Sequence, residues 1–262
     1  PRLRQFEDWL GSAGTTAARL YTHPAVSART DAEAIEFPAV EHRRFEPRHV
    51  EPADGLEWLL RAAVAAQRIG PDGLRRTQQQ SLFKRDAVRF QSDPILIAPL
   101  ADRTGPLPDA GLLALEFAIG LGLVERSAAE LRPVPAPPIF ENSLGDCLAE
   151  LWRSLFTVEG WDPVHGGTGP DIENPLSSMS LAAFLSLRSI PADEWTTASA
   201  VVEPLLANHP SWSAHLKRDG EAARQWIENL YLDVGMPARW VEACRDGNER
   251  WFRLGDVGRH LL

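Results

Sequence analysis

The sequence predicts a mainly α-helical protein with small β-hairpins, organised as two similar domains in tandem. Three observations support this class: apolar residues recur at helical spacing, strand-like runs flank tight turns in two places, and a run of prolines divides the 262-residue chain near its middle. The length agrees with one or two domains. The longest apolar stretch, 110–123, is interrupted by Glu116 and three glycines, so no membrane span is expected.

The charge is unevenly distributed. The chain carries 36 acidic and 27 basic residues, a formal net charge of −9. Residues 1–138 hold 18 acids and 17 bases, whereas residues 139–262 hold 18 acids and 10 bases. This balance excludes a strongly basic nucleic-acid-binding protein, because phosphate binding needs an excess of cations on one face. Any DNA contact is expected in the first half, and the acidic second half favours a protein partner.

The two cysteines, Cys147 and Cys244, are 97 positions apart and both lie in apolar patterns. This spacing does not match a disulfide framework or a zinc site, so both are predicted to be small core residues. Free cysteines favour a reducing, cytoplasmic location. No cofactor is expected.

The first predicted domain spans residues 56–134 and follows a poorly patterned N-terminal extension, 1–55. Leu56, Leu59, Leu60, Ala63 and Val64 form an apolar stripe over a helix at 56–69. Asp54 is the expected cap, and Gly70-Pro71 ends the helix. An extended segment at 74–77, a short basic helix near 83–90, a helix at about 110–120 and two strands at 122–126 and 131–134 are expected to follow.

A proline-rich linker, 135–141, precedes the second predicted domain. The run Pro133-Val-Pro-Ala-Pro-Pro138 favours polyproline II and cannot join a helix. We therefore place the domain boundary there.

The second predicted domain spans residues 142–262. Asn142 or Ser143 is expected to cap a helix whose core stripe runs from Leu144 to Phe156. Further helices are predicted near 178–187, 197–207 and 220–234. Aromatic and β-branched residues flank the turn Arg245-Asp-Gly-Asn248, which indicates a hairpin over 239–254, followed by a short helical tail.

The two domains end alike, each with an amphipathic helix, a glycine, a strand, a tight turn and a second strand. An isolated two-stranded hairpin is marginally stable in water, so each hairpin is expected to pack on the helices before it. A helical bundle closed by such a hairpin is the plan of a winged-helix domain. The sequence therefore predicts tandem winged-helix-like domains.

Two segments carry a resemblance to known proteins. The tail WFRLGDVGRHLL (251–262) resembles the segment from the last strand to the final helix of winged-helix proteins, although Gly255 stands where a capping threonine is common. The stretch GLRRTQQQSLFKRDAVRF (73–90) resembles part of the XPB/Ssl2-like N-terminal (helicase-conserved C-terminal) domain of bacterial helicase-associated proteins. This resemblance implies winged-helix units that accompany DNA helicases or repair machinery.

The first domain contains the candidate DNA-backbone-binding residues. A basic helix with nearby amides suits contact with phosphates. The alternative is an ordinary surface on which Asp72, Asp86 and Asp93 pair with these bases, each pair contributing little. The candidates, which lie around the amides of 78–80, are Arg75, Arg76, Lys84, Arg85 and Arg89.

The helix before the second hairpin is predicted to bind a partner protein rather than DNA. It presents three carboxylates, Glu221, Glu228 and Asp233, against Arg224, with the amides Gln225 and Asn229 beside them. The carboxylates oppose phosphate, and the arginine-to-guanine contact is nearly absent.

Two tryptophans of the second hairpin complete this surface. Trp240 and Trp251 are expected either to form a stabilising cross-strand pair or to provide an exposed anchor for a partner. The predicted partner-binding residues are therefore Arg224, Glu228, Trp240 and Trp251.

The loop from Trp161 to Asp171 suggests a third possibility. Asp162, His165 and Asp171 could bind a metal or act as a general base with its orienting group. No nucleophile accompanies them in sequence, and the favoured interpretation is a flexible connection. We therefore predict no catalytic residue and no metal site.

These observations favour a non-catalytic winged-helix adaptor in a bacterial DNA-handling assembly for helicase, repair or defence functions. It would bind a protein partner, such as a helicase or nuclease subunit, through the acidic second domain, and possible but weak DNA contact would come from the first. One alternative is a stand-alone DNA-binding transcriptional regulator. The other is a small hydrolase that uses the Asp162–His165 loop.

Overall fold

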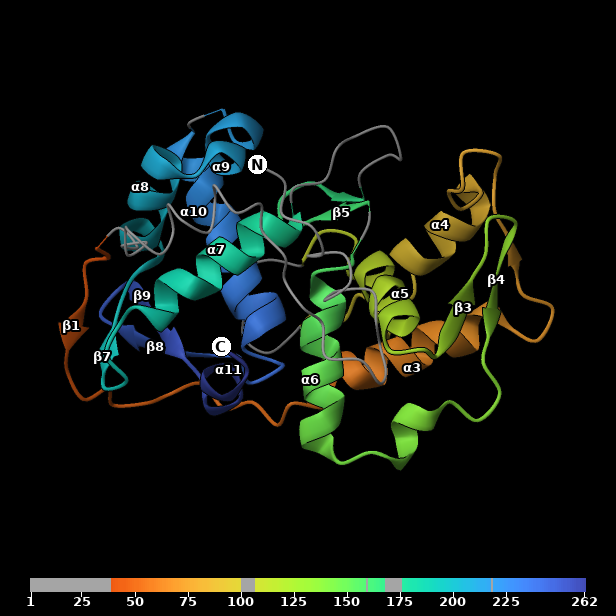
Figure 1. Ribbon diagram of the computed structural model, residues 1–262, viewed down its shortest axis with the longest axis horizontal. Coiled ribbons are helices and arrows are strands. Elements are labelled where there is room, and N and C mark those ends of the chain that lie inside the picture. Colours follow the sequence, from red (N-terminus) through yellow and green to blue (C-terminus); the bar gives the residue numbers. More distant parts are fainter. Residues whose placement is uncertain (1–38, 100–106, 159, 168–175, 218) are drawn as a thin grey trace, which may run out of the picture. The chain divides into compact units, whose positions relative to one another are not determined.

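A computed structural model describes residues 39–99, 107–158, 160–167, 176–217 and 219–262, and these ranges bound every statement below. The described chain is mainly helical with small antiparallel sheets, as the sequence predicted. Figure 1 shows the elements of residues 57–133 gathered on one side of residues 39–262, those of residues 176–254 on the other, and α6 and β5 between them.

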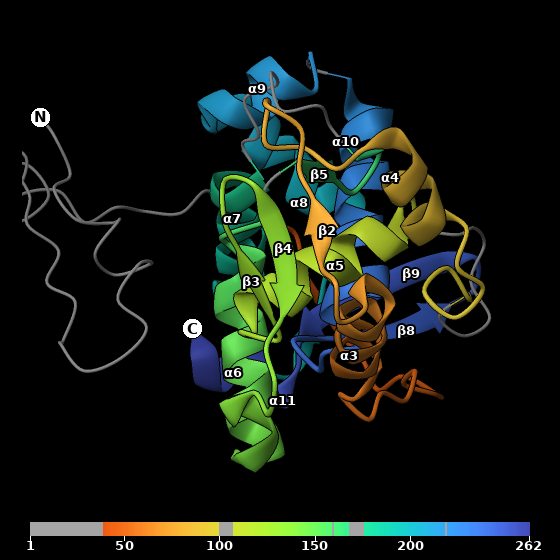
Figure 2. The ribbon, with the colours of Figure 1, turned by 90° about the vertical axis from the view of Figure 1, so that its right-hand side faces the viewer.

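The first of these groups, here called the N-terminal repeat (residues 57–133), has three helices and three strands. Figure 2 shows the strands side by side in the order β2-β4-β3, all antiparallel. The hairpin β3–β4 was predicted, and β2 adds to its β4 edge, where Leu74 faces Leu131. The elements are α3 (Glu57–Ile69), β2 (Leu74–Arg75), α4 (Lys84–Gln91), α5 (Ala110–Gly120), β3 (Val124–Arg126) and β4 (Glu130–Pro133).

Helix α3 begins and ends where the sequence predicted, but it buries a different face. Asp54 accepts a hydrogen bond from the backbone N–H of Leu56 at 2.8 Å, and Gly70 ends the helix with a φ of 78°. The predicted apolar stripe was wrong: Leu60 is 59% exposed, whereas Trp58 is fully buried. The indole of Trp58 packs edge-on against Phe117 at 5.3 Å, and its large area decides the orientation of the helix.

The second group, the C-terminal repeat (residues 176–254), is preceded by α6 and by a small hairpin, β5–β6. The predicted cap of α6 is confirmed, because Ser143 Oγ accepts from the N–H of Asp146 at 3.2 Å. The elements from the second half of the linker onward are a 3₁₀ turn η1 (Pro138–Glu141), α6 (Leu144–Leu155), β5 (Trp161–Asp162), β6 (Gly166–Gly167), α7 (Leu176–Arg188), β7 (Glu194–Trp195), α8 (Ala198–Asn208), α9 (Pro210–His215), α10 (Gly220–Asn229), a π-helical turn η2 (Leu230–Gly235), β8 (Val241–Asp246), β9 (Glu249–Leu254) and α11 (Asp256–Leu261).

The predicted hairpin β8–β9 is present, and a third segment joins it. Asp246 pairs with Glu249 across the turn, where Gly247 has a φ of 63°. Thr196, directly after β7, exchanges two backbone hydrogen bonds with Phe252 of β9, at 2.9 and 2.7 Å. The C-terminal repeat therefore places its first extended segment beside the second strand of its hairpin, as β2 lies beside β4 in the N-terminal repeat.

Residues 39–55 belong to this second sheet region. Strand β1 (Arg43–Arg44) pairs antiparallel with β7, and Val50 forms a bridge with Cys244. Part of the predicted N-terminal extension is thus built into the C-terminal half, while residues 1–38 of it lie outside the described residues.

Helix α11 explains the glycine spacing of the C-terminal tail. A Cβ on Gly255 would lie 2.3 Å from the carbonyl oxygen of Arg239, and one on Gly258 would lie 2.2 Å from that of Trp240. Both positions need glycine because the helix lies directly on the backbone that leads into β8.

The two repeats pack together rather than standing apart. Residues 39–262 form one compact unit, in which α5 contacts α6. A Cβ on Gly120 would lie 2.4 Å from Ser154 Oγ, which shows how closely the two helices approach. Within the proline-rich linker, Ile139 is buried and its carbonyl accepts a hydrogen bond from Cys147 Sγ at 3.3 Å. The linker is therefore packed against α6.

Candidate functional sites

The predicted DNA-backbone residues lie on β2, the turn after it and α4. Lys84 and Arg75 are exposed, and the side chain of Arg85 is 92% exposed and 3.8 Å from Asp86. Arg76 donates to the carbonyl of Ser127 at 2.7 Å, and Arg89 donates to that of Arg68 at 2.7 Å. Two of the five side chains, those of Arg76 and Arg89, therefore bind backbone carbonyls. The other three side chains are exposed to solvent.

The carboxylates expected to neutralise this cluster do so only in part. Asp93 pairs instead with Arg68, at 2.6 Å, which lies outside the predicted cluster. Asp86 is itself buried, and its Oδ1 lies 3.8 Å from Arg85 Nε. Three exposed cations thus remain on the N-terminal repeat, Arg75 on β2 and Lys84 and Arg85 on α4.

Helix α5, which precedes the first hairpin, is almost entirely apolar. Its sequence AGLLALEFAIG contains no basic residue, and its residues from Ala110 to Ala118 are mostly buried. Gly111 lets it approach the chain at Phe90, where an added Cβ would lie 2.0 Å from the carbonyl oxygen. The helix is a core element, with only a partly open face.

That open face borders a cleft of about 960 Å³. Leu112 and Ile119 of α5 form one wall, and Phe156 and Trp161 form another. The turn 78–80 contributes amide side chains at the rim. No sequence pattern indicated this cleft, because its lining extends from Arg76 to Ser177, 101 positions apart.

Helix α10, which precedes the second hairpin, presents a closed ion-pair network. Arg224 lies 2.5 Å from both Glu221 and Glu228. The hydrogen bond from Arg224 lowers the pKa of Glu221 and raises that of Arg224 itself. Asp233 does not share this surface, since it is buried in the π-helical turn η2. The predicted partner-binding residues Arg224 and Glu228 therefore lie together on one surface.

The two tryptophans predicted to share a role, Trp240 and Trp251, have different surroundings in the structure. Trp240 is fully buried and packs edge-on against Trp152 at 5.1 Å, so its assignment to the partner surface was wrong. It does not face Trp251, which lies opposite Cys244 in the hairpin. The reason is that Trp240 precedes β8 and points into the helical core.

Trp251 instead joins two residues that the sequence did not single out. The guanidinium of Arg43 lies 4.6 Å from its ring centre and 4.7 Å from that of Phe45. Phe45 and Trp251 meet edge-on at 5.3 Å. Arg43 and Phe45 belong to a segment without recognisable periodicity, so no local signal could have indicated this stack.

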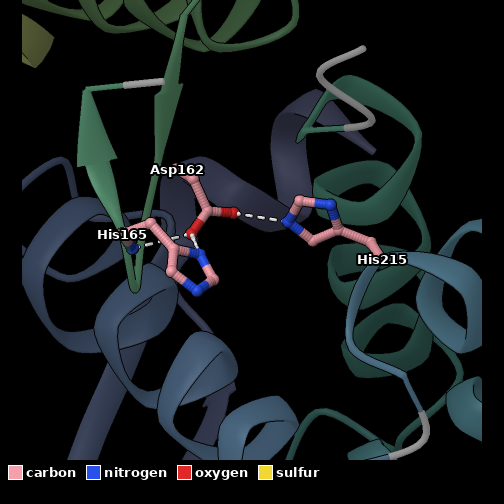
Figure 3. A group of neighbouring side chains, drawn as sticks. All are labelled: Asp162, His165 and His215. Carbon is pink, nitrogen blue, oxygen red and sulfur yellow. Dashed lines mark hydrogen bonds and ion pairs between the residues drawn. The ribbon is translucent and has the colours of Figure 1, made fainter. Parts of the chain in front are cut away.

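A histidine–aspartate cluster lies where the sequence predicted a flexible connection. That interpretation was wrong for residues 161–167, since they form the hairpin β5–β6 and Asp162 is only 2% exposed. Asp171 lies outside the described residues. The Asp162 carboxylate faces His165 of the same hairpin and His215 of α9 (Figure 3). His215 is 53 positions away, which is why sequence spacing missed it.

Three N–H groups and two histidine ring nitrogens surround the Asp162 carboxylate. Oδ1 accepts from the backbone N–H of Val164 and His165 and lies 2.9 Å from His165 Nδ1. Oδ2 accepts from Trp226 Nε1 at 2.9 Å and lies 3.1 Å from His215 Nε2.

These groups decide the charge state of the aspartate. Burial acts to raise the pKa of Asp162, but the surrounding donors outweigh it and hold the pKa below its ordinary value. The aspartate is thus a buried anion, and the ligand atoms of the three side chains lie within 4.8 Å of one another.

The hairpin that carries this cluster joins the two repeats. Trp161 Nε1 donates to the carbonyl of Pro108 at 2.9 Å, and the N–H of Gly167 donates to Asp109 at 2.7 Å, both at the start of α5. On the other side, Asn229 of α10 donates to the carbonyl of Pro163 at 2.6 Å. A change in the position of this hairpin would therefore alter hydrogen bonds to both repeats.

Comparisons with protein-family models, curated proteins and solved structures found no match to this chain. Within the described residues, no helix has both the length and the apolar character needed to cross a lipid bilayer.

Proposed function

We propose that this protein is a non-catalytic adaptor built from two winged-helix-like repeats, which docks a protein partner in a bacterial DNA-handling assembly. A helicase or nuclease subunit is the partner class we favour. The proposal takes its cellular setting from the sequence resemblance and its mode of action from the surfaces described above.

The winged-helix interpretation is supported by element order. Each repeat runs helix, short strand, one or two helices, a further helix and a hairpin, and the short strand or its extension pairs with the hairpin's second strand. Two unrelated packings would not be expected to share both order and pairing.

The observation that carries the adaptor proposal concerns the helix before each hairpin, which is the element that usually enters the DNA major groove in such folds. In the N-terminal repeat this helix is α5, which is buried and has no basic residue. In the C-terminal repeat it is α10, whose Arg224 is held by Glu221 and Glu228. Neither helix offers a free cation to guanine or phosphate, so protein contact is the better use of both surfaces.

Affinity capture with the full chain as bait tests the proposal. We expect recovery of a helicase or nuclease subunit, and loss of that protein in Glu228→Lys and Trp251→Ala. Glu203→Lys is the matched control, because Glu203 is an exposed glutamate on α8 that takes no part in the Arg224 ion pairs with Glu221 and Glu228. Recovery that is the same for all three variants would contradict the proposal.

A second candidate, DNA-backbone binding, is favoured by the three exposed cations Arg75, Lys84 and Arg85. Three phosphate contacts predict a slope of about −3 for log K against log salt concentration on duplex DNA. A stand-alone regulator requires tight binding at physiological salt that Arg85→Glu abolishes. Binding that disappears above low salt would instead support the adaptor, with the N-terminal repeat giving weak additional contact.

A further inference from the structure

We propose that Asp162, His165 and His215 bind one divalent transition-metal ion, with Zn²⁺ the ion that fits best, and that this ion fastens the β5–β6 hairpin to α9. The proposal is independent of the adaptor function. It assigns a ligand to the cluster around Asp162.

The first argument is the donor set. Two imidazole nitrogens and one carboxylate oxygen are typical ligands of Zn²⁺, which binds them at about 2.0–2.2 Å. Ligand atoms around a tetrahedral ion then lie about 3.3 Å apart. In the structure, His165 Nδ1 lies 2.9 Å from Oδ1 of Asp162 and His215 Nε2 lies 3.1 Å from Oδ2, and one ligand atom from each of the three side chains lies within 4.8 Å of the other two. The two rings therefore need only move toward one carboxylate oxygen for the three atoms to surround an ion.

The second argument is the hydrogen-bond count at the aspartate. A carboxylate has about four lone-pair positions. The N–H groups of Val164, His165 and Trp226 are fixed by the backbone or by a buried ring and occupy three of them. One position on Oδ2 remains when the histidine rings turn from the carboxylate to the ion. The fixed donors then act as the outer hydrogen bonds that orient a metal-bound carboxylate.

The third argument is charge. The carboxyl group of Asp162 is buried, and the groups within hydrogen-bond distance of it are two backbone amides, an indole and two imidazole nitrogens. Among the described residues, no lysine or arginine forms an ion pair with it. A buried anion needs a compensating cation, and a metal ion held by the same imidazoles supplies one.

The three ligands also lie on two separate elements that one ion would join. Asp162 and His165 lie at the two ends of the β5–β6 turn, while His215 is the last residue of α9. The ring of His165 is 61% exposed and that of His215 18% exposed, so an ion can enter from the solvent side. The fourth coordination position would face this opening and accept water.

Titration of the full chain with Zn²⁺, after removal of metal with a chelator, tests the proposal. Calorimetry is expected to show one ion bound per chain, and saturating Zn²⁺ is expected to raise the unfolding temperature, since a ligand that binds only the folded state stabilises it. Mg²⁺ is expected to have no effect, because it prefers oxygen ligands. Co²⁺ should give the visible absorption bands of a four-coordinate site.

His165→Ala is the decisive variant, because its exposed ring can be removed without disturbing the core. We expect its Zn²⁺ affinity to fall about 100-fold and the Co²⁺ bands to disappear. His49→Ala is the matched control, since His49 is exposed and lies outside the cluster. His215→Ala should match His165→Ala, with circular dichroism confirming that it folds.

Two results would overturn the proposal. One is the absence of saturable one-to-one Zn²⁺ binding by the natural chain. The other is equal Zn²⁺ affinity in the natural chain, His165→Ala and His49→Ala, which would assign the binding to scattered surface histidines. Either result would leave the cluster as a hydrogen-bonded support for the hairpin, and neither bears on partner capture.

Discussion

The indole Nε1 of Trp226 donates a hydrogen bond of 2.9 Å to Oδ2 of Asp162, a residue 64 positions earlier in the chain. Both residues are buried, so this bond connects the core of α10 to the hairpin between the repeats. It is one of the three fixed donors that hold the carboxylate in place. Its removal should therefore weaken the connection without creating a large cavity.

Trp226→Phe tests this bond in metal-free buffer. We expect the free energy of unfolding to fall by about 1–3 kcal/mol, because a buried charged acceptor loses a donor and the smaller ring leaves a slight gap. Urea denaturation followed by circular dichroism measures the change. Trp212→Phe is the matched control: its Nε1 donates a longer bond, 3.3 Å, to the neutral carbonyl of Met179. An equal loss in both variants would assign the effect to ring size alone.

Gly258→Ala should destabilise the C-terminal repeat. The added Cβ would lie 2.2 Å from the carbonyl oxygen of Trp240, so α11 must move away from the backbone before β8. We expect a loss of about 1–3 kcal/mol in the free energy of unfolding, as for other overpacked sites.

Gly220→Ala is the control for this prediction. An added Cβ at Gly220, the first residue of α10, meets nothing within 4 Å. Alanine there should be neutral or slightly stabilising, because it favours the helix. Thermal unfolding of both variants compares the two sites. A Gly258→Ala protein as stable as Gly220→Ala would show that α11 does not rest on the Trp240 backbone.

Arg61→Met should cost about 2–4 kcal/mol in the free energy of unfolding. Arg61 is 3% exposed and donates to the carbonyls of Leu96 and Ala98, both at 2.6 Å. Methionine retains the length of the side chain but leaves these carbonyls without their donor. Arg85→Met is the control, because its side chain is 92% exposed and a change within about 0.5 kcal/mol is expected. Chemical denaturation of the two variants measures both changes in the free energy of unfolding.

Asp93 should make stability depend on acid pH. Burial acts to raise the pKa of this carboxyl, but hydrogen bonds from the N–H groups of Ile95 and Leu96, together with Arg68, hold the pKa below its ordinary value of 3.8. A carboxyl whose pKa is lowered by folding stabilises the protein above its unfolded-state pKa. That contribution is lost as the pH falls through the folded-state pKa.

Asp93→Asn measures this contribution. The natural chain should be more stable than the variant at neutral pH, and the difference should shrink as the pH falls below about 4. Unfolding midpoints in urea over a pH series provide the measurement. A difference that is constant with pH would show that the ionised form of Asp93 contributes nothing.

Local features of this fold followed from the sequence because they depend on neighbouring residues. Ser143 caps α6 through an N–H three residues away, and Gly70 ends α3 because it adopts a positive φ. The Asp-Gly turn set the register of β8–β9. In each case the deciding interaction spans a few residues, so it is visible as a motif.

Other features were decided by contacts between distant segments. Helical spacing predicted one apolar stripe for α3, whereas the fit of Trp58 against Phe117, together with the carbonyls that Arg61 satisfies, selected a different buried face. The addition of β2 and Thr196 to the two hairpins likewise required backbone partners more than 50 residues away.

The histidine–aspartate cluster shows the same division. The sequence placed Asp162 and His165 close together, since they are three residues apart, but it indicated neither His215 nor the burial of the carboxylate. Those came from the packing of α9 and α10 on the β5–β6 hairpin. Periodicity and turn motifs determine where helices and hairpins form, because their energies are local. Which faces meet, and which side chains gather around a buried charge, depends on burial and hydrogen bonding that exist only once the chain has folded.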